Sequence, residues 1–163
     1  YTGMTAAVRQ QINATVRENF AGLDLDVRVL PGVSLPAKDY STVLFGGSNP
    51  EAYGIAQKID PFNRDPNDQA IIFTEMFTPN RFGRVLTAYE LGVAIGNIAS
   101  HEIGHLLGLN HVADVMDLMD TTGSAETFLN NQTFKDSVLD VTISPLGTQD
   151  SLLLLLETIG WTY

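Results

Sequence analysis

The chain has 163 residues, a length typical of one domain, which would span 1–163. Its hydrophobic fraction of 44% and charged fraction of 17% exclude a disordered protein. Nine basic and nineteen acidic residues give a net charge of -10, which excludes sequence-independent nucleic-acid binding because phosphate is also negative. The absence of cysteine excludes disulfides, thiolate zinc clusters and a cysteine nucleophile.

The first half of the sequence predicts one helix followed by several short strands. Residues 5–20 carry an apolar residue at every fourth position, which indicates an amphipathic helix. Residues 23–30 alternate apolar and polar side chains, a pattern typical of a half-buried strand. Further strands are predicted at 42–45, 53–59 and 70–74, with a polar loop at 60–69. This order favours a mixed sheet backed by helices, that is, an α+β fold.

The second half predicts two helices separated by irregular sequence. Residues 89–107 have the longest helical pattern, and Gly108 supplies a stop. A final helix is expected to begin near 148–150 and to end at Gly160. Its five consecutive leucines, Leu152–Leu156, would cover every side of a helix, so we expect this helix to be buried nearly all round. The run is far shorter than the roughly 20 residues that span a membrane.

All three histidines of the chain lie between residues 101 and 111. His101 and His105 are four residues apart on the predicted helix, so both rings project from one face and can bind one zinc ion. Gly108 permits a turn that reverses the chain, and His111 can then return as the third ligand. Glu102 lies at the edge of the same face and stays free of the metal. Three protein ligands leave a position open for water, which is the arrangement of a catalytic zinc site.

The stretch HEIGHLLGLNH at 101–111 resembles the metzincin zinc-peptidase signature HExxHxxGxxH at every specified position. Metzincins also have a methionine turn beneath the zinc, and residues 114–120 lie where it belongs. Met119 is preferred to Met116, because its spacing from His111 is similar to that of the matrixin branch. Val112 stands where matrixins usually have serine, and Thr121 stands where astacins and serralysins have an additional tyrosine ligand, so the branch stays open.

The resemblance implies a metzincin-like zincin fold. A mixed twisted sheet and an active-site helix would form an upper N-terminal subdomain at 1–108. A small lower subdomain at 109–163 would end in a helix. An extended peptide substrate would lie between them and pair with an edge strand, for which residues 70–74 are the candidate, and residues 121–128 would form the far wall of the pocket.

The same resemblance implies a zinc-dependent endopeptidase. His101, His105 and His111 would hold Zn²⁺, Met119 would support them, and Glu102 would be the general base that takes a proton from a metal-activated water. The expected partner is a protein or peptide substrate, and the expected state is a secreted monomer, extracellular or at the cell surface. Two alternatives remain: an inactive zinc-binding recognition module, and a zinc hydrolase that acts on a non-peptide substrate.

Three further features carry open alternatives. The loop at 60–68 has the oxygen-rich composition of a Ca²⁺ site, but it is also what a plain solvated turn uses. Asp114, Asp117 and Asp120 either orient the histidine N–H groups or are surface charge. Residues 85–163 contain one basic and ten acidic residues, a net charge of -9, which would favour substrates with Lys or Arg near the scissile bond if the acids face the cleft.

Overall fold

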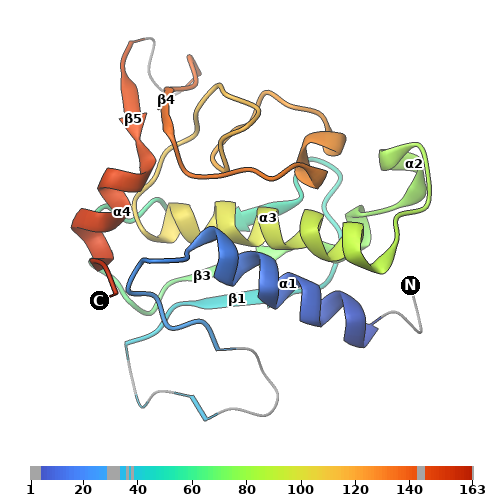
Figure 1. Cartoon of the computed structure of the whole chain (residues 1–163), viewed down its shortest axis with the longest axis horizontal. Coiled ribbons are helices and arrows are strands. Elements are labelled where there is room, and N and C mark those ends of the chain that lie inside the picture. The colour runs from blue at the N-terminus through green and yellow to red at the C-terminus, as the bar shows by residue number, and fades with distance from the viewer. Residues whose placement is uncertain (1–4, 29–33, 36, 38, 143–145, 163) are drawn as a thin grey trace.

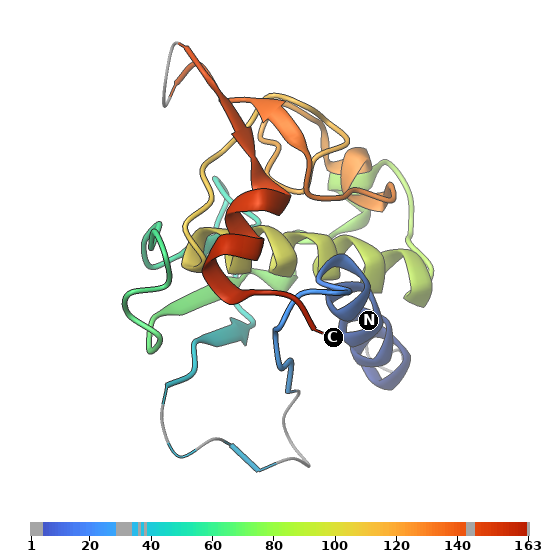
Figure 2. The same ribbon diagram turned by 60° about the vertical axis from the view of Figure 1, so that its left-hand side comes forward.

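A computed structural model of the chain describes residues 5–28, 34–35, 37, 39–142 and 146–162. Two long helices lie beside a small mixed sheet, and a hairpin with a final helix lies on the other side of the longer helix (Figure 1, Figure 2). The predicted α+β class is therefore confirmed. Among the described residues no helix is both long and apolar enough to cross a membrane.

The two long helices pack directly against each other. The predicted helix at 5–20 is α1 (Thr5–Asn19), and the one at 89–107 is α3 (Ala88–Leu106). Glycine on α3 lets the helices approach closely, since a Cβ placed on Gly96 would lie 2.6 Å from the Cβ of Thr15. This contact fixes α3, which carries most of the candidate site, against the N-terminal part of the core.

The start of α3 is fixed by a capping box. Thr87 accepts a hydrogen bond from the backbone N–H of Glu90, and the Glu90 carboxylate accepts one from the backbone N–H of Thr87. Two backbone N–H groups at this helix end are thereby satisfied. The 19-residue helix then runs without interruption to the histidines at its C-terminal end.

The sheet has the strand order β1-β3-β2, with β1 (Thr42–Phe45) parallel and β2 (Gly54–Ala56) antiparallel to β3 (Gln69–Ile72). The strands predicted in these three regions are confirmed, although β2 is shorter than the predicted 53–59. The proposal of 70–74 as a free edge strand is wrong, because β3 is paired on both sides. The edge strand that packs against α3 is β2.

The strand predicted at 23–30 is wrong for its described part. Residues 24–28 have no strand pairing, and Leu23 forms only an isolated bridge with Trp161. The backbone N–H of Asp24 donates to the carbonyl of Gly160 at 3.0 Å. The alternating pattern encodes a half-buried extended segment, but the segment meets the C-terminal end of the chain at Leu23 and Asp24 and does not pair with a neighbouring strand. Residues 29 and 30 lie outside the described residues.

Short elements connect and follow the main ones. After β3 come η1 (Thr74–Met76) and α2 (Pro79–Phe82), and after α3 comes η2 (Ala125–Leu129). The chain then forms an antiparallel hairpin of β4 (Asp136–Val138) and β5 (Thr148–Asp150) and ends in α4 (Ser151–Ile159). Residues 148–150, where the final helix was expected to begin, are thus strand β5, and α4 begins directly after it at Ser151.

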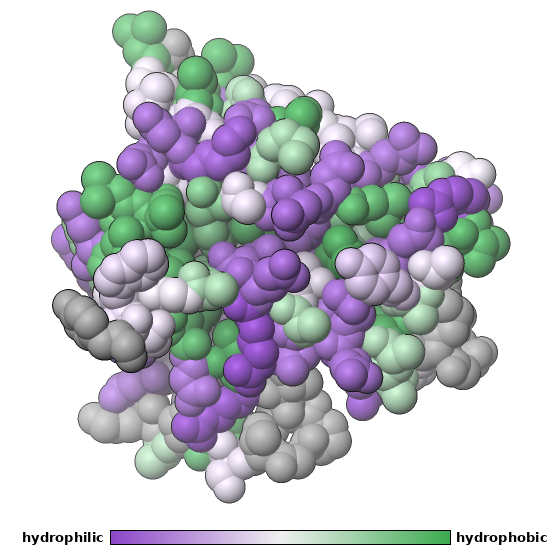
Figure 3. Space-filling view, in the orientation of Figure 1, coloured by the Kyte–Doolittle hydropathy of each residue, from purple (hydrophilic) through white to green (hydrophobic). Residues whose placement is uncertain are grey.

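The expectation that the final helix is buried nearly all round is wrong. Within α4 only Ser151 and Leu155 are buried, while Leu152 and Leu153 are 41% and 50% exposed. Figure 3 shows apolar surface on this side of the molecule, over α4 and the hairpin. A run of five leucines contains no information on which side faces the core, because every side of the helix is apolar.

Candidate metal centre

The C-terminal end of α3 and the turn after it bring the histidines together. His101 and His105 lie on the last two turns of the helix, and Gly108 follows with a φ of 100°. This left-handed conformation favours glycine. A Cβ at Gly108 would also lie 2.7 Å from the Cα of Pro61, so the turn has no room for a side chain. The chain reverses here and carries His111 back to the helix.

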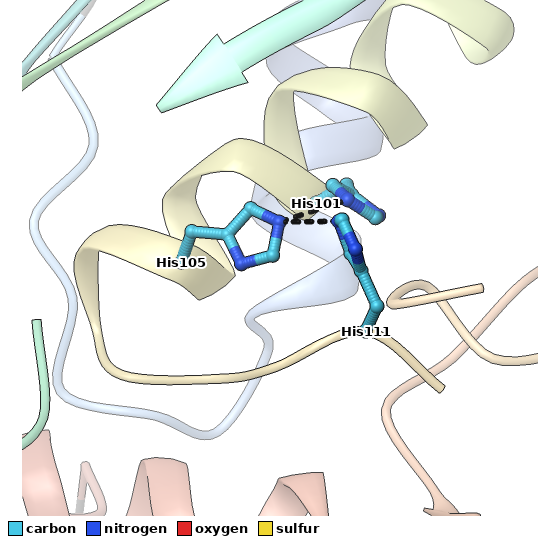
Figure 4. A group of neighbouring side chains, drawn as sticks. All are labelled: His101, His105 and His111. Carbon is cyan, nitrogen blue, oxygen red and sulfur yellow. Dashed lines mark hydrogen bonds between the residues drawn. The ribbon is translucent and has the colours of Figure 1, made fainter. Parts of the chain in front are cut away.

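The three imidazoles converge through their Nε2 atoms. His105 Nε2 lies 3.1 Å from His101 Nε2 and 2.9 Å from His111 Nε2 (Figure 4). Within the described part of the chain, this is the one set of three or more His, Cys, Asp or Glu residues whose ligand atoms all lie within 4.8 Å of one another. The sequence-predicted trio is therefore brought to one point.

Backbone carbonyls fix the tautomer of two of these rings. His101 Nδ1 is 2.7 Å from the carbonyl oxygen of Leu118, and His105 Nδ1 is 2.7 Å from that of Leu109. A carbonyl only accepts, so each Nδ1 carries the proton, and each Nε2 presents a lone pair. Nitrogen lone pairs at about 3 Å repel one another unless a cation lies between them.

This donor set fits zinc. Zinc is bound by neutral imidazole at about 2.0–2.1 Å, and tetrahedral geometry then places the nitrogens roughly 3.3 Å apart. The separations of 2.9 and 3.1 Å are close to that value. Three nitrogen donors leave one tetrahedral position for a further ligand, as in catalytic rather than structural zinc sites.

The surroundings keep the histidines uncharged. Burial lowers the pKa of His101 well below its ordinary value, lowers that of His105 to about 4, and also lowers that of His111. At His111 the carboxylates of Asp140 and Asp120 oppose this effect. Neutral imidazole is the form that binds a metal.

Glu102 lies beside the histidines and beneath the edge strand β2. Its side chain is buried, and its carboxylate accepts a hydrogen bond from the backbone N–H of Ala56. Burial raises the pKa of the Glu102 carboxyl to about 7, and the Ala56 N–H partly offsets this shift. The structure thus places a buried carboxyl directly after His101 on the helix that carries two of the three histidines.

Met119 packs under the histidine helix, as the resemblance implies for the methionine turn. It is fully buried, and its Sδ lies 2.6 Å from the position that a Cβ on Gly104 would take. Met116, by contrast, is 41% exposed. The residue before Met119 contributes the carbonyl that holds His101, so the position of this turn affects the metal centre directly.

The three aspartates near this turn do not accept the Nδ1 protons of His101 and His105, which go to backbone carbonyls. Asp114 pairs with Lys135, and Asp120 accepts from the hydroxyl of Thr122 and the backbone N–H of Gly123. Asp117 is fully buried, and its two oxygens accept from the backbone N–H of Met119 at 2.9 Å and from the Ser137 hydroxyl at 2.7 Å. No pattern in the sequence indicates this internal role, because it depends on Ser137 in β4, 20 residues away.

The loop at 60–68 contains carboxylate and amide oxygens that lack hydrogen bonds. Asp60 and Asp68 are 5% and 1% exposed. Asp68 accepts from the Ser41 hydroxyl with one oxygen, while its Oδ2 and the Oδ1 of Asn63 are buried without a partner. Burial, with the neighbouring charge of Asp60, raises the pKa of the Asp68 carboxyl. Two buried oxygens of this loop, Asp68 Oδ2 and Asn63 Oδ1, therefore lack a donor.

Comparison with known families gives one match. The sequence model described as Matrixin matches residues 38–141, which is 104 of the 163 residues. The matched region contains the three histidines, Glu102 and Met119. No curated protein and no solved structure matches the chain.

Proposed function

The chain belongs to the matrixin family, and on this premise we propose that it is a zinc-dependent endopeptidase of the metzincin type. The observation that carries the proposal is the convergence of three Nε2 lone pairs at one point, with the buried Glu102 directly after His101 on the same helix. His101, His105 and His111 would hold the zinc, with Met119 packed beneath them. When bound, zinc supplies a Lewis acid that polarises the scissile carbonyl and activates water.

Glu102 is the residue that we assign as general base. It takes the proton from the attacking water and then delivers it to the leaving nitrogen of the peptide. Its burial beneath β2 excludes bulk water from the carboxylate, and the Ala56 N–H holds the carboxylate against the strand. Neutral histidine ligands support this chemistry because they leave the full charge of the metal available to a developing oxyanion.

The substrate-pairing strand in this proposal is β2. The backbone N–H of Phe73 donates to Tyr53 and that of Gln57 donates to Gln69, so the odd-numbered residues of this segment bond to β3. The N–H and C=O groups of Gly54 and Ala56 therefore point away from β3. The Ala56 N–H donates there to the Glu102 carboxylate, so a substrate would pair with the Gly54 groups and the Ala56 carbonyl. An extended peptide can pair there, between residues 1–108 above and residues 109–163 below, with residues 121–128 as the far wall.

We further propose Ca²⁺ at the 60–68 loop. The ion would use Asp60, Asn63 and Asp68, whose oxygens are buried and in part lack donors. Hard oxygen ligands are those that calcium prefers. The loop touches the metal centre, since the Asp60 N–H donates to the His105 carbonyl at 2.9 Å and Pro61 packs on Gly108. A bound ion would stabilise the turn that returns His111.

Membership of the family also underlies our proposal that the protein acts outside the cell, on protein or peptide substrates and as a monomer. The two alternatives, an inactive zinc-binding module and a zinc hydrolase of non-peptide substrates, predict different outcomes of one experiment. A non-catalytic zinc site has no use for a buried carboxyl beside it, so Glu102 favours the peptidase.

The test is a combined measurement of zinc content and casein digestion. We expect one zinc per chain, digestion that stops with 1,10-phenanthroline, and recovery when zinc is added. Glu102→Gln should keep the zinc and lose on the order of 10³-fold in activity, as expected for removal of a general base. The matched control is Glu157→Gln, which changes an exposed glutamate on α4 and should keep full activity.

Two results would overturn the proposal. Zinc binding without digestion of casein or of a mixed peptide library would identify the inactive module. Zinc-dependent hydrolysis confined to non-peptide esters would identify the other hydrolase. Full activity of Glu102→Gln would leave the peptidase intact but remove the assigned general base.

A further inference from the structure

Gly54, on the edge strand, lies directly over the carboxyl of Glu102. A Cβ built on Gly54 would stand 2.6 Å from Glu102 Oε1, 2.8 Å from Cγ and 3.0 Å from the carboxyl carbon. These are distances that real Cβ atoms essentially never show. Every residue other than glycine at position 54 would therefore have to displace the Glu102 side chain or the strand.

The Glu102 carboxyl occupies the space over Gly54 on one face of β2. Side chains alternate across a strand, so positions 54 and 56 face one side and Ile55 faces the other. Ile55 is 46% exposed, whereas Ala56 donates its backbone N–H to the Glu102 carboxylate. The Glu102 carboxylate thus accepts a hydrogen bond from the Ala56 N–H and fits into the space that a side chain on Gly54 would fill.

Backbone strain does not explain a glycine at this position. Gly54 lies in the paired strand β2, opposite Ile72, and its φ is not in the left-handed region. Alanine adopts this extended backbone conformation without cost. The contact with Glu102 is therefore what an added methyl group would change.

We propose that Gly54 is a positioning residue for Glu102, whose lack of a side chain allows the carboxyl to reach its place beside the three histidines. The catalytic consequence rests on the proposed function, but the steric contact between Gly54 and Glu102 does not depend on it. An added Cβ pushes the carboxyl away from the Ala56 N–H. It leaves the histidines in place, because none of their ring contacts involves β2.

The first test uses activity in a double-mutant cycle on the zinc-loaded protein. Gly54→Ala should lower kcat on the order of 100-fold, with KM changed only a few-fold and the zinc content unchanged. In the Glu102→Asp background, the shorter side chain leaves room for the added methyl group. In that background the same Gly54→Ala substitution should lower kcat only a few-fold. Equal losses in both backgrounds, or no loss in the wild-type background, would overturn the proposal.

The second test needs no activity, so it separates failure of this inference from failure of the proposed function. Gly54→Ala should lower Tm by about 5 °C in the wild-type background, as overpacking of a buried contact does. In the Glu102→Ala background it should lower Tm by no more than about 1 °C, because the clashing side chain is absent. The matched control is Ile55→Ala on the opposite face, whose Tm shift should be the same in both backgrounds. A Tm shift of Gly54→Ala that does not depend on Glu102 would contradict the steric contact, whatever the activity of the protein.

Discussion

The orientation of His101 and His105 depends on carbonyl groups of the backbone rather than on carboxylates. Leu118 and Leu109 accept the Nδ1 protons of His101 and His105. Because these acceptors are neutral, they fix the tautomer without adding negative charge beside the metal centre. The position of the Leu118 carbonyl depends in turn on Asp117, which holds the next residue, Met119, by its backbone N–H.

Asp117→Ala should therefore affect both stability and zinc binding. The substitution removes the acceptor of the Met119 N–H and of the Ser137 hydroxyl in a fully buried position. We expect a loss of about 2–3 kcal/mol in the free energy of unfolding, measured by urea denaturation of the zinc-free protein. Zinc affinity, measured by competition with a chelator, should fall roughly 10-fold because the Leu118 carbonyl shifts.

Two related variants separate hydrogen bonding from charge. Asp117→Asn keeps an acceptor for the Met119 N–H, so its loss of stability should be under about 1 kcal/mol. Asp114→Ala removes a partly exposed carboxylate that pairs with Lys135, and it should also cost under about 1 kcal/mol. If Asp114→Ala destabilises the protein as much as Asp117→Ala does, the buried hydrogen bonds are not the cause.

For single residues, the sequence was sufficient to predict that the three histidines come together, and insufficient to predict the contacts around them. Spacing along one helix and one turn places His101, His105 and His111, because these contacts are local in the chain. Gly54 meets Glu102 across 48 residues, and that contact depends on strand register and on how β2 packs on α3. No pattern within a single sequence encodes such a meeting point.

Among the helices and strands, positions that depend on local sequence were predicted correctly, and strand pairing that depends on distant contacts was not. The helices α1 and α3 follow from apolar periodicity and from local caps, and both were predicted nearly to the residue. The position of β3 in the centre of the sheet depends on which strands pair, and its assignment to an edge was wrong. The segment at 23–28 has strand-like alternation, yet its contacts with the C-terminal end of the chain are one isolated bridge at Leu23 and one hydrogen bond from Asp24.

The loop at 60–68 is the element whose behaviour should depend most on ions. The raised pKa of Asp68 means that its charged form is disfavoured in the folded protein. For an acid with a raised pKa, the contribution to stability is present below the unfolded pKa of about 3.9 and is lost as the pH rises through the folded pKa. At neutral pH without calcium, Asp68 therefore destabilises the fold.

Calcium should reverse this destabilisation. In zinc-loaded protein at pH 7, we expect Ca²⁺ at 100 times its Kd to raise Tm by about 5 °C or more in scanning calorimetry. Asp68→Asn should abolish this rise, and in calcium-free buffer it should itself be more stable than the wild type. Asp26→Asn, at an exposed carboxylate paired with Arg28, should leave the calcium response unchanged. A calcium response that survives Asp68→Asn would place the ion elsewhere.

In the molecule as a whole, most of the net negative charge belongs to the C-terminal half of the chain, which also contains the three histidines. Residues 85–163 carry a net charge of -9, and their single basic residue, Lys135, is engaged with Asp114. Two of these acids, Asp120 and Asp140, lie close enough to His111 to act on its pKa. Their field therefore reaches the place where we propose that the scissile bond binds.

This field should make cleavage depend on the charge of the substrate. We expect matched peptides with Lys beside the scissile bond to have a kcat/KM about 5-fold higher than peptides with Glu there at 20 mM salt. The preference should decrease toward unity at 0.5 M salt, where the Debye length is about 4 Å and screening removes interactions between exposed charges. Asp140→Asn should reduce the preference at low salt, because the charge of Asp140 acts at His111, where the scissile bond is proposed to bind. A Gln peptide should fall between the two, and equal cleavage of all three at low salt would show that the acidic side chains face solvent away from the substrate.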